Sequence, residues 1–211
     1  MTQPDNTVPM IDVSSAQPAI DWAAVYASGV RAATVETAVG NDGGNPCAVA
    51  QVAGARAAGL LVGSYSFAYP IGLPGAGRDP QGQAARHAQL AAVAAAGVAW
   101  DLPHVLDLEW PERAQWDRWG CSADQIVQWV IAYSIARPEV TRLYVSPGYL
   151  AELGNPPELA RFDLWLADWA DAATVPAPWT DWAAWQHSAH GRAPGIAGDV
   201  DLSWLRVPPP T

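Results

Sequence analysis

Short hydrophobic runs alternate with amphipathic stretches along most of the chain. Eight of these runs have the length and the β-branched and aromatic content of strands. We predict strands at residues 8–13, 30–35, 60–67, 102–110, 141–146, 162–167, 182–187 and 200–205. Between them, the spacing of apolar residues and the turn residues predict helices at 20–29, 45–59, 79–97, 122–137 and 147–153.

Capping residues mark the start of four of these helices. Asp21 stands before an apolar helical stretch, and Asn45 and Asp79 are each followed by a proline, which favours the first helical position. Ser122 and Gln125 have the spacing of a capping box. The sequence therefore predicts an N-cap at each of these positions.

The order of the elements predicts the fold class. Strand and helix alternate through the first five strands, and this alternation is typical of parallel strands joined by right-handed crossovers. The last three strands are joined by loops alone. We predict an α/β protein, an irregular TIM-like barrel of five β/α units followed by three strands, in a single domain spanning 1–211 with its core at about 8–206. The Gly- and Pro-rich run 70–80 is predicted to be a loop, and 208–211 a tail.

Composition excludes several classes of function. Half of the residues are hydrophobic and 15% are charged, which indicates a globular chain. The net charge of −10 argues against a nucleic-acid-binding surface, which needs a basic stripe. No segment is long and apolar enough to span a membrane, so we expect no membrane insertion. The first residues lack a positive charge followed by an apolar run, so we expect no signal peptide.

No metal or cofactor site is expected from the sequence. His104, His187 and His190 lack a credible ligand spacing, and no phosphate-binding or dinucleotide-binding motif follows a strand. Cys47 and Cys121 lie far apart and are predicted to be free thiols.

Acidic residues stand at the ends of two predicted strands and on a third. Asp107 and Glu109 are two residues apart, so their side chains point to the same face of a strand. Asp12 ends the first strand, and Asp201 lies on the last, which neighbours the first in a closed barrel. Adjacent carboxyls oppose each other's ionisation, and such a pair commonly keeps one carboxyl protonated as a general acid. The alternative is that both acids of the 107/109 pair are solvated at a loop edge.

Aromatic residues are the candidates for sugar binding, because the chain has 12 tryptophans and large rings often line sugar grooves. The candidates on predicted strands are Tyr65, Phe67, Tyr144, Trp165 and Trp185. Packing in the barrel core is an equally good interpretation for each ring. Asp168 follows a strand and is either a groove residue or a solvated loop acid.

Ordered sequence blocks give the chain a resemblance to a known family. The blocks are 11–17 with 20–22, 55–60 through 63–67, 106–109, 143–146, 164–167, 182–186 and 198–203. Together they resemble glycoside hydrolase family 25, the Chalaropsis-type lysozymes, over about residues 9–205. The resemblance implies an irregular barrel of five β/α units plus three strands. It also implies cleavage of the β-1,4 bond between N-acetylmuramic acid and N-acetylglucosamine in peptidoglycan.

Residue roles follow from the resemblance by position. It implies that Glu109 is the general acid and that Asp12, Asp107 and Asp201 complete a catalytic acidic cluster. Asp107 would either orient the substrate N-acetyl group as an internal nucleophile or position a water, so the stereochemistry stays open. Gln186, at the end of one matching block, would contact substrate. Asp199 shares a strand face with Asp201, and the block alignment favours Asp201.

The chain also departs from the family pattern. Glu36 stands where the family usually has a lysine, Asn45 replaces a common aspartate, and His187 replaces a common tyrosine. These changes bear on substrate preference and on the pH optimum, and they leave the four acids in place.

The sequence hypothesis is therefore a lysozyme that acts, as a monomer and without cofactor, on peptidoglycan glycan strands. The alternatives are a non-catalytic barrel that binds peptidoglycan or chitin, and a glycosidase acting on another N-acetylated polysaccharide. We expect a phage endolysin held in the host cytoplasm until it is released to the wall, or an injected or secreted effector.

Overall fold

The computed structural model describes residues 2–41, 43–70 and 79–207. The strands are β1 (Thr7–Val13), β2 (Ala32–Val39), β3 (Gly43–Gly44), β4 (Leu61–Phe67), β5 (His104–Asp107), β6 (Val140–Val145), β7 (Asp163–Ala167), β8 (Ala184–Gly191) and β9 (Val200–Arg206). The helices are α1 (Trp22–Ala27), α2 (Ala48–Ala57), α3 (Pro80–Ala95), α4 (Arg113–Trp119), α5 (Ala123–Ala136) and α6 (Pro147–Glu152), with a 3-10 helix at Pro157–Arg161. Most of the predicted loop at 70–80 and all of the predicted tail lie outside the described residues.

Eight strands close into a barrel. They pair in the order β1-β9-β8-β7-β6-β5-β4-β2, and a β1–β2 pairing closes the ring. Seven neighbouring strands are parallel, in the order β1, β2, β4, β5, β6, β7 and β8. The eighth strand, β9, lies between β8 and β1 and is antiparallel to both. The two-residue β3 adds to the end of β2. The structure confirms the predicted mixed α/β fold with a closed eight-stranded barrel.

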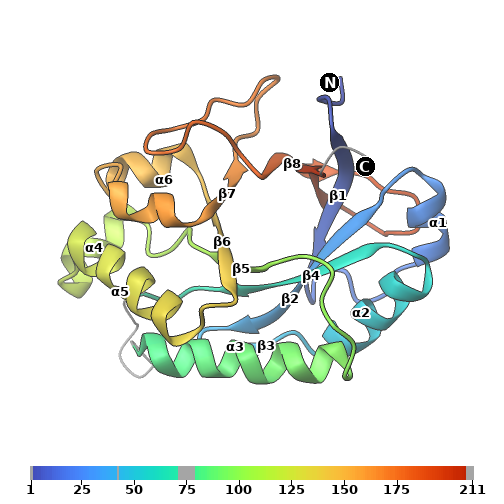
Figure 1. Ribbon diagram of the computed structural model, residues 1–211, viewed down its shortest axis with the longest axis horizontal. Coiled ribbons are helices and arrows are strands. Elements are labelled where there is room, and N and C mark those ends of the chain that lie inside the picture. The colour runs from blue at the N-terminus through green and yellow to red at the C-terminus, as the bar shows by residue number, and fades with distance from the viewer. Residues whose placement is uncertain (1, 42, 71–78, 208–211) are drawn as a thin grey trace.

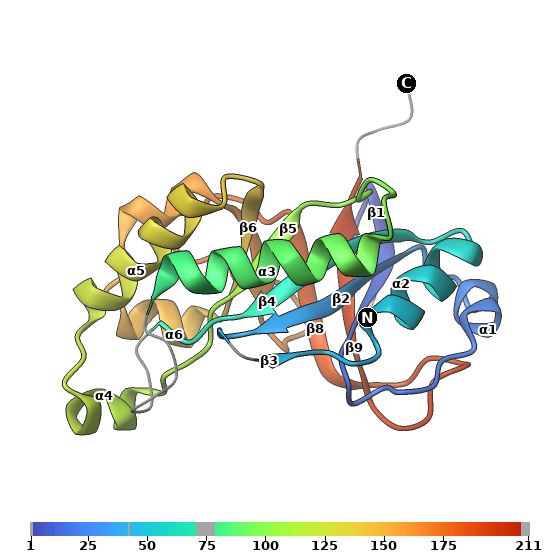
Figure 2. The same cartoon turned by 90° about the horizontal axis from the view of Figure 1, so that it is seen from below.

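Helices cover most of the outside of the barrel. Figure 1 shows α4, α5 and α6 on one side and α1 and α2 on the other, and in Figure 2 α3 crosses the strands between them. Two helices follow β5 where the sequence predicts one, so the helix count differs from the prediction in this segment. The additional helix, α4, is anchored by Trp116, which is 2% exposed and donates a hydrogen bond to the Pro111 carbonyl at 2.9 Å.

Strand alternation sorts the core into an inner and an outer part. The interior of the barrel is filled by rings and small aliphatic side chains, with Met10, Val105 and Trp165 among them. On the other face of β5, Leu106 packs in the cluster that α5 completes with Ile126. This division is the one expected when successive side chains of a strand point to opposite faces.

Three of the four predicted N-caps are confirmed. Asp21 caps α1, Asp79 caps α3, and Ser122 forms the capping box of α5. The prediction for Asn45 is wrong, because α2 begins at Ala48.

Asn45 is used for another purpose. It is buried, and its amide nitrogen donates to the Glu36 carbonyl at 3.1 Å and to Gln51 Oε1 at 2.7 Å. Its own Oδ1 accepts a hydrogen bond from the Cys47 N–H, in the turn that leads into the helix. Asn45 therefore ties β2 to α2 instead of capping the helix.

No disulfide joins Cys47 and Cys121, as predicted. Within the described ranges, no helix has the length and hydrophobicity that a bilayer crossing requires.

Candidate active site

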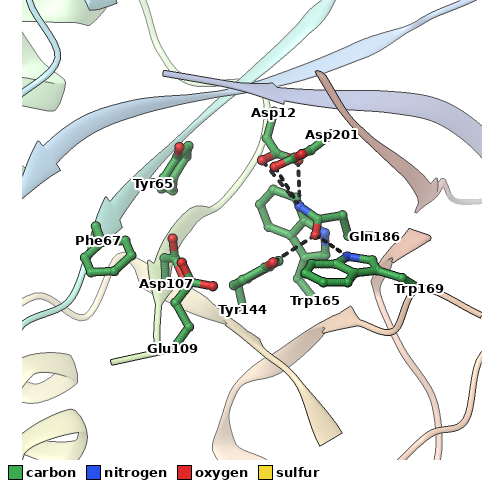
Figure 3. A pocket seen from close by; sticks show the side chains of 10 residues that line it. All are labelled: Asp12, Tyr65, Phe67, Asp107, Glu109, Tyr144, Trp165, Trp169, Gln186 and Asp201. Carbon is green, nitrogen blue, oxygen red and sulfur yellow. Dashed lines mark hydrogen bonds between the residues drawn. The ribbon is translucent and has the colours of Figure 1, made fainter. Parts of the chain in front are cut away.

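A cavity of about 180 Å³ opens at the carboxyl ends of the barrel strands. Its walls come from seven of the eight barrel strands or the residues that directly follow them. Figure 3 shows the lining side chains converging on the cavity. The lining residues are Asp12, Tyr65, Phe67, Asp107, Glu109, Tyr144, Trp165, Trp169, Gln186 and Asp201. Barrel enzymes place their catalytic groups at this end, so the cavity is the candidate active site.

Asp12 and Asp201 form one half of the acidic cluster. They are paired residues of the antiparallel β1–β9 ladder, so their side chains lie next to each other on the inner face. Burial, followed by the charge of Asp201, raises the pKa of Asp12 well above its usual range. The hydrogen bond between the two carboxyls raises the pKa of Asp12 and opposes the rise in pKa that burial causes in Asp201.

The Gln186 amide links this pair to the opposite wall. Its nitrogen donates to Asp12 Oδ2 at 3.2 Å and to Asp201 Oδ2 at 3.3 Å. Its oxygen accepts hydrogen bonds from the Tyr144 hydroxyl at 2.8 Å and from the Trp169 indole N–H at 2.9 Å. All four polar partners of the amide are drawn in Figure 3.

Asp107 and Glu109 form the other half of the cluster. Asp107 is the last residue of β5 and is 8% exposed, and its Oδ1 has no hydrogen-bond partner within the described part of the chain. Burial raises the pKa of Asp107 well above its usual range, and the charges of Glu109 and Asp12 raise it further. Glu109 lies two residues beyond the strand, is more open to solvent, and has its pKa raised by partial burial and by Asp201.

The four carboxyl groups of the acidic cluster make proton transfer possible in this cavity. Carboxyls whose pKa values are raised remain protonated at a pH where free Asp and Glu are ionised, so they are able to donate a proton. Glu109 is the member that combines a raised pKa with access to solvent and therefore to a ligand.

Nine of the eleven residues predicted for the site line the cavity. Trp185 does not, because it neighbours Gln186 on β8 and adjacent strand residues face opposite sides. Its ring is buried among the outer hydrophobic residues, and its indole N–H donates to the Asp168 carbonyl at 2.7 Å.

Asp168 lines a neighbouring cavity of about 420 Å³. This second cavity adjoins the first, since both are lined by Glu109, Tyr144 and Trp169. Asp199, the alternative to Asp201, is an exposed residue paired with Arg192 at 2.9 Å and does not line the first cavity.

Trp169 is the lining residue that the sequence interpretation missed. It comes two residues after the end of β7, where the period-two pattern of the strand gives no guidance. Its position directly after the candidate Asp168, at the same strand end, is the signal that would have identified it.

No metal centre is built at this site. Within the described residues, no group of three His, Cys, Asp or Glu side chains is arranged to hold a metal ion. His187 instead stacks on Trp204 with ring centroids 5.2 Å apart. Both residues neighbour inward-facing residues on their strands, so the stack lies on the outer face of the barrel.

A closed barrel with carboxyl groups converging at its strand ends, beside an aromatic-lined cavity, has the paired acids that glycoside hydrolysis requires. Comparisons with known proteins identify the family. The model of "Glycosyl hydrolases family 25" matches residues 11–196. This chain belongs to that family, as the sequence blocks predicted.

Characterised relatives agree with this assignment. The chain is 30% identical over 204 residues to Lysozyme M1 of Streptomyces globisporus, covering 90% of this chain and 65% of that protein's length. It is 31% identical to the N,O-diacetylmuramidase of Chalaropsis sp., covering 92% and 96% of the two chains. The crystal structure of a bacterial lysozyme from Streptomyces coelicolor superposes with a TM-score of 0.81 at 29% identity, over 97% of this chain and 94% of that one.

Proposed function

We propose that this chain is a lysozyme, an N-acetylmuramidase that hydrolyses the β-1,4 bond between N-acetylmuramic acid and N-acetylglucosamine in bacterial peptidoglycan. The observation that carries the proposal is the convergence of Asp12, Asp107, Glu109 and Asp201 in one cavity of a family 25 barrel. We assign that barrel to the family's plan of five β/α units and three strands, with α4 as an insertion.

Glu109 is the general acid in this proposal. It donates its proton to the bridging oxygen as the glycosidic bond breaks, and water supplies the hydroxyl group to the sugar carbon. The raised pKa of Glu109 keeps the proton in place to a higher pH than on a free glutamate. Asp107, beside it, either orients the N-acetyl group of the substrate as an internal nucleophile or positions the water.

Asp12 and Asp201 act from the opposite wall. Ionised Asp201 raises the pKa of Glu109, and the Asp12–Asp201 pair places negative potential where positive charge develops on the sugar ring. Tyr65, Phe67, Tyr144 and Trp165 line the space that the sugar would occupy. The second cavity extends the site beyond Glu109 and offers room for further units of a glycan strand.

The test is clearing of purified cell walls, followed by identification of the new reducing end. A muramidase releases N-acetylmuramic acid at the reducing end, whereas a glucosaminidase releases N-acetylglucosamine. Glu109→Gln should lower the rate by about 10²–10⁴-fold, the usual contribution of a general acid. Glu158→Gln, an exposed residue on the 3-10 helix, is the matched control and should retain full activity.

Three results would contradict the proposal in different ways. Equal clearing by wild type and Glu109→Gln would remove Glu109 as the acid. Binding of walls by the wild type without any cleavage would favour the non-catalytic barrel, and cleavage of chitin in preference to walls would favour the other glycosidase. NMR identifies the anomer that is released first and so distinguishes retention from inversion of configuration at the sugar carbon.

The proposal includes a biological setting and an oligomeric state. The protein is a phage endolysin that acts on the wall after release from the host cytoplasm, and it is a monomer in solution. A neighbouring gene for a small membrane-spanning protein would support this setting. An isolated chromosomal gene, or a dimer in sedimentation experiments, would contradict the corresponding part.

A further inference from the structure

Trp169 is an exposed tryptophan at the boundary between the two cavities. Its side chain is 64% exposed, an unusual state for the largest apolar side chain. It lines both the cavity that contains the carboxyl groups and the larger cavity beside it. In Figure 3 its ring lies across the pocket from Asp107 and Glu109.

A hydrogen bond restrains this exposed ring. The indole N–H donates to Gln186 Oε1 at 2.9 Å, so the edge of the ring is attached to the wall of the site. A side chain that is anchored at its edge loses little further freedom when a ligand packs on its face. A pyranose ring has one face of C–H bonds that packs well on an aromatic plane, while its hydroxyl groups remain solvated.

The same hydrogen bond determines which way the Gln186 amide faces. Tyr144 and Trp169 both donate to the amide oxygen, at 2.8 and 2.9 Å. Reversing the amide would direct its N–H groups toward two donors, so the oxygen is held on that side. The nitrogen is therefore directed to Asp12 and Asp201, where it donates at 3.2 and 3.3 Å.

Donation by Gln186 has a defined electrostatic effect. A hydrogen bond to a carboxylate stabilises its ionised form, and the Gln186 contact lowers the pKa of Asp12 against the larger effect of burial. The orientation of one amide thus influences how the negative charge is divided between the carboxyl groups of the site.

We propose that Trp169 serves the reaction in two ways: its exposed face binds a sugar ring that bridges the two cavities, and its indole N–H positions the Gln186 amide toward Asp12 and Asp201. The inference rests on the proposed glycan-cleaving function and adds to it a sugar-binding residue that also positions the Gln186 amide. The ligand class is a neutral N-acetylated hexose unit of a glycan strand.

Two substitutions separate the two contributions. Trp169→Phe keeps an aromatic face and removes the N–H group, whereas Trp169→Leu removes both. Each would be measured for kcat, for KM on solubilised glycan strands, and for the titration of Asp12 by carbon-13 NMR of its labelled carboxyl group. Binding of a purified peptide-free tetrasaccharide of alternating N-acetylglucosamine and N-acetylmuramic acid would be measured in the Glu109→Gln background, where no cleavage intervenes.

Trp169→Phe should leave the dissociation constant of the tetrasaccharide within about 2-fold, since the aromatic face remains. In the same variant, the titration midpoint of Asp12 should rise by about 0.5 pH unit and kcat should fall, because the Gln186 amide is held less firmly. Trp169→Leu should give the same midpoint and, in addition, weaken binding and raise KM by about 5–10-fold. Ile135→Ala, which removes a 72% exposed side chain on α5, is the control and should change none of these values.

A double-mutant cycle tests the positioning role directly. Gln186→Leu should raise the Asp12 midpoint, and adding Trp169→Phe should raise it no further, because both changes act through one amide. Independent shifts, or an unchanged midpoint in Trp169→Phe, would overturn the positioning role. Equal tetrasaccharide binding by Trp169→Leu and wild type, or no binding by either, would overturn the binding role.

Failure of the proposed function would look different. A wild-type protein that cleaves no wall preparation would refute the lysozyme activity, and the NMR titration and the binding measurement would still decide the role of Trp169. If Trp169→Leu does not fold, the Trp169→Phe protein decides the positioning role. Trp169→Tyr, which keeps an aromatic face but lacks the indole N–H, is a second variant that confirms or overturns the positioning role.

Discussion

Asp12 and Asp201 stand directly opposite each other in the antiparallel ladder between the first and last barrel strands, and one glutamine amide donates to both. Two carboxyls 189 positions apart in the sequence are thus brought together by the closure of the barrel. Burial raises the pKa of both carboxyls, and the proximity of Asp201 raises the pKa of Asp12 further. Ring closure is therefore a requirement of the chemistry as well as of the fold.

Asp201→Asn should shift the pH dependence of activity. The Asp201 charge raises the pKa of Glu109, so its removal lowers that pKa and Glu109 loses its proton at a lower pH. The alkaline limb of the pH–rate profile should move toward acid, so that activity falls by up to about 10-fold at pH values on that limb. Rates of wall clearing between pH 4 and 9 provide the measurement.

Asp199→Asn is the matched control for this prediction. Asp199 lies two residues away and pairs with Arg192 at the surface, outside the carboxyl cavity. Its substitution should leave the profile unchanged. A shift in the Asp199 variant, with none in the Asp201 variant, would mean that Asp199 and not Asp201 has the functional role.

Glu36→Gln should stabilise the protein increasingly as the pH rises above 4.5. Burial raises the pKa of Glu36 from its usual 4.5 to about 7, so the folded protein holds this proton more tightly than the unfolded chain. The stability associated with the proton is complete below pH 4.5 and is lost as the pH rises through 7. The amide carries no charge, so the variant should gain about 2 kcal/mol over wild type at pH 8 and nothing at pH 4.5. Urea unfolding at the two pH values, with Glu158→Gln as control, measures the difference, and an equal gain at both would contradict this origin.

Protonation of His104 should lower the stability of the folded protein in acid. Burial and the nearby Arg137 lower the pKa of His104 from 6.5 to about 4, so the folded protein holds the neutral ring. The associated stability is present above pH 6.5 and is lost as the pH falls through 4. His104→Gln, which can still hydrogen-bond the Ser64 hydroxyl, should therefore lose less stability than wild type between pH 7 and pH 4.

His190→Gln is the control for the acid prediction, because the His190 side chain is 84% exposed. Thermal melting of the three proteins at several pH values provides the comparison. If the His104 variant and wild type change in parallel, the acid sensitivity arises elsewhere in the protein.

Much of the site was predictable because closed barrels impose two simple rules. The alternation of side chains along a strand predicted a common face for Asp107 and Glu109, and both line the cavity. The adjacency of first and last strands predicted that Asp201 would meet Asp12. Applied consistently, the same alternation would have excluded Trp185 once Gln186 was assigned to the inner face, since neighbouring strand residues cannot both point inward.

The remaining features depend on residues where no periodicity operates. Trp169 lies beyond a strand end, and its role depends on the three-dimensional position of Gln186. Asn45 has the sequence context of an N-cap, yet its amide bonds to β2 and to Gln51, because both partners come within reach only in the folded barrel. Local pattern identifies a residue's options, and tertiary contacts select among them.

Leu106 directly precedes Asp107 on β5, and its side chain packs in the outer hydrophobic core. Its substitution therefore tests whether the candidate site depends on core packing. Leu106 is fully buried on β5 and packs in the cluster that includes Ile126 and Val130 of α5. Leu106→Ala should lower the free energy of unfolding by about 2–5 kcal/mol through lost burial and a residual cavity. Leu61→Ala, on the neighbouring strand and 40% exposed, should cost far less. Because the neighbouring Asp107 is fixed by its own backbone pairing, with its carbonyl accepting from Ala68 N–H at 2.9 Å, activity per folded molecule should remain near wild type. Urea unfolding combined with wall clearing at low temperature separates the two effects, and a loss of specific activity in the folded Leu106 variant would mean that packing behind β5 sets the position of the acids.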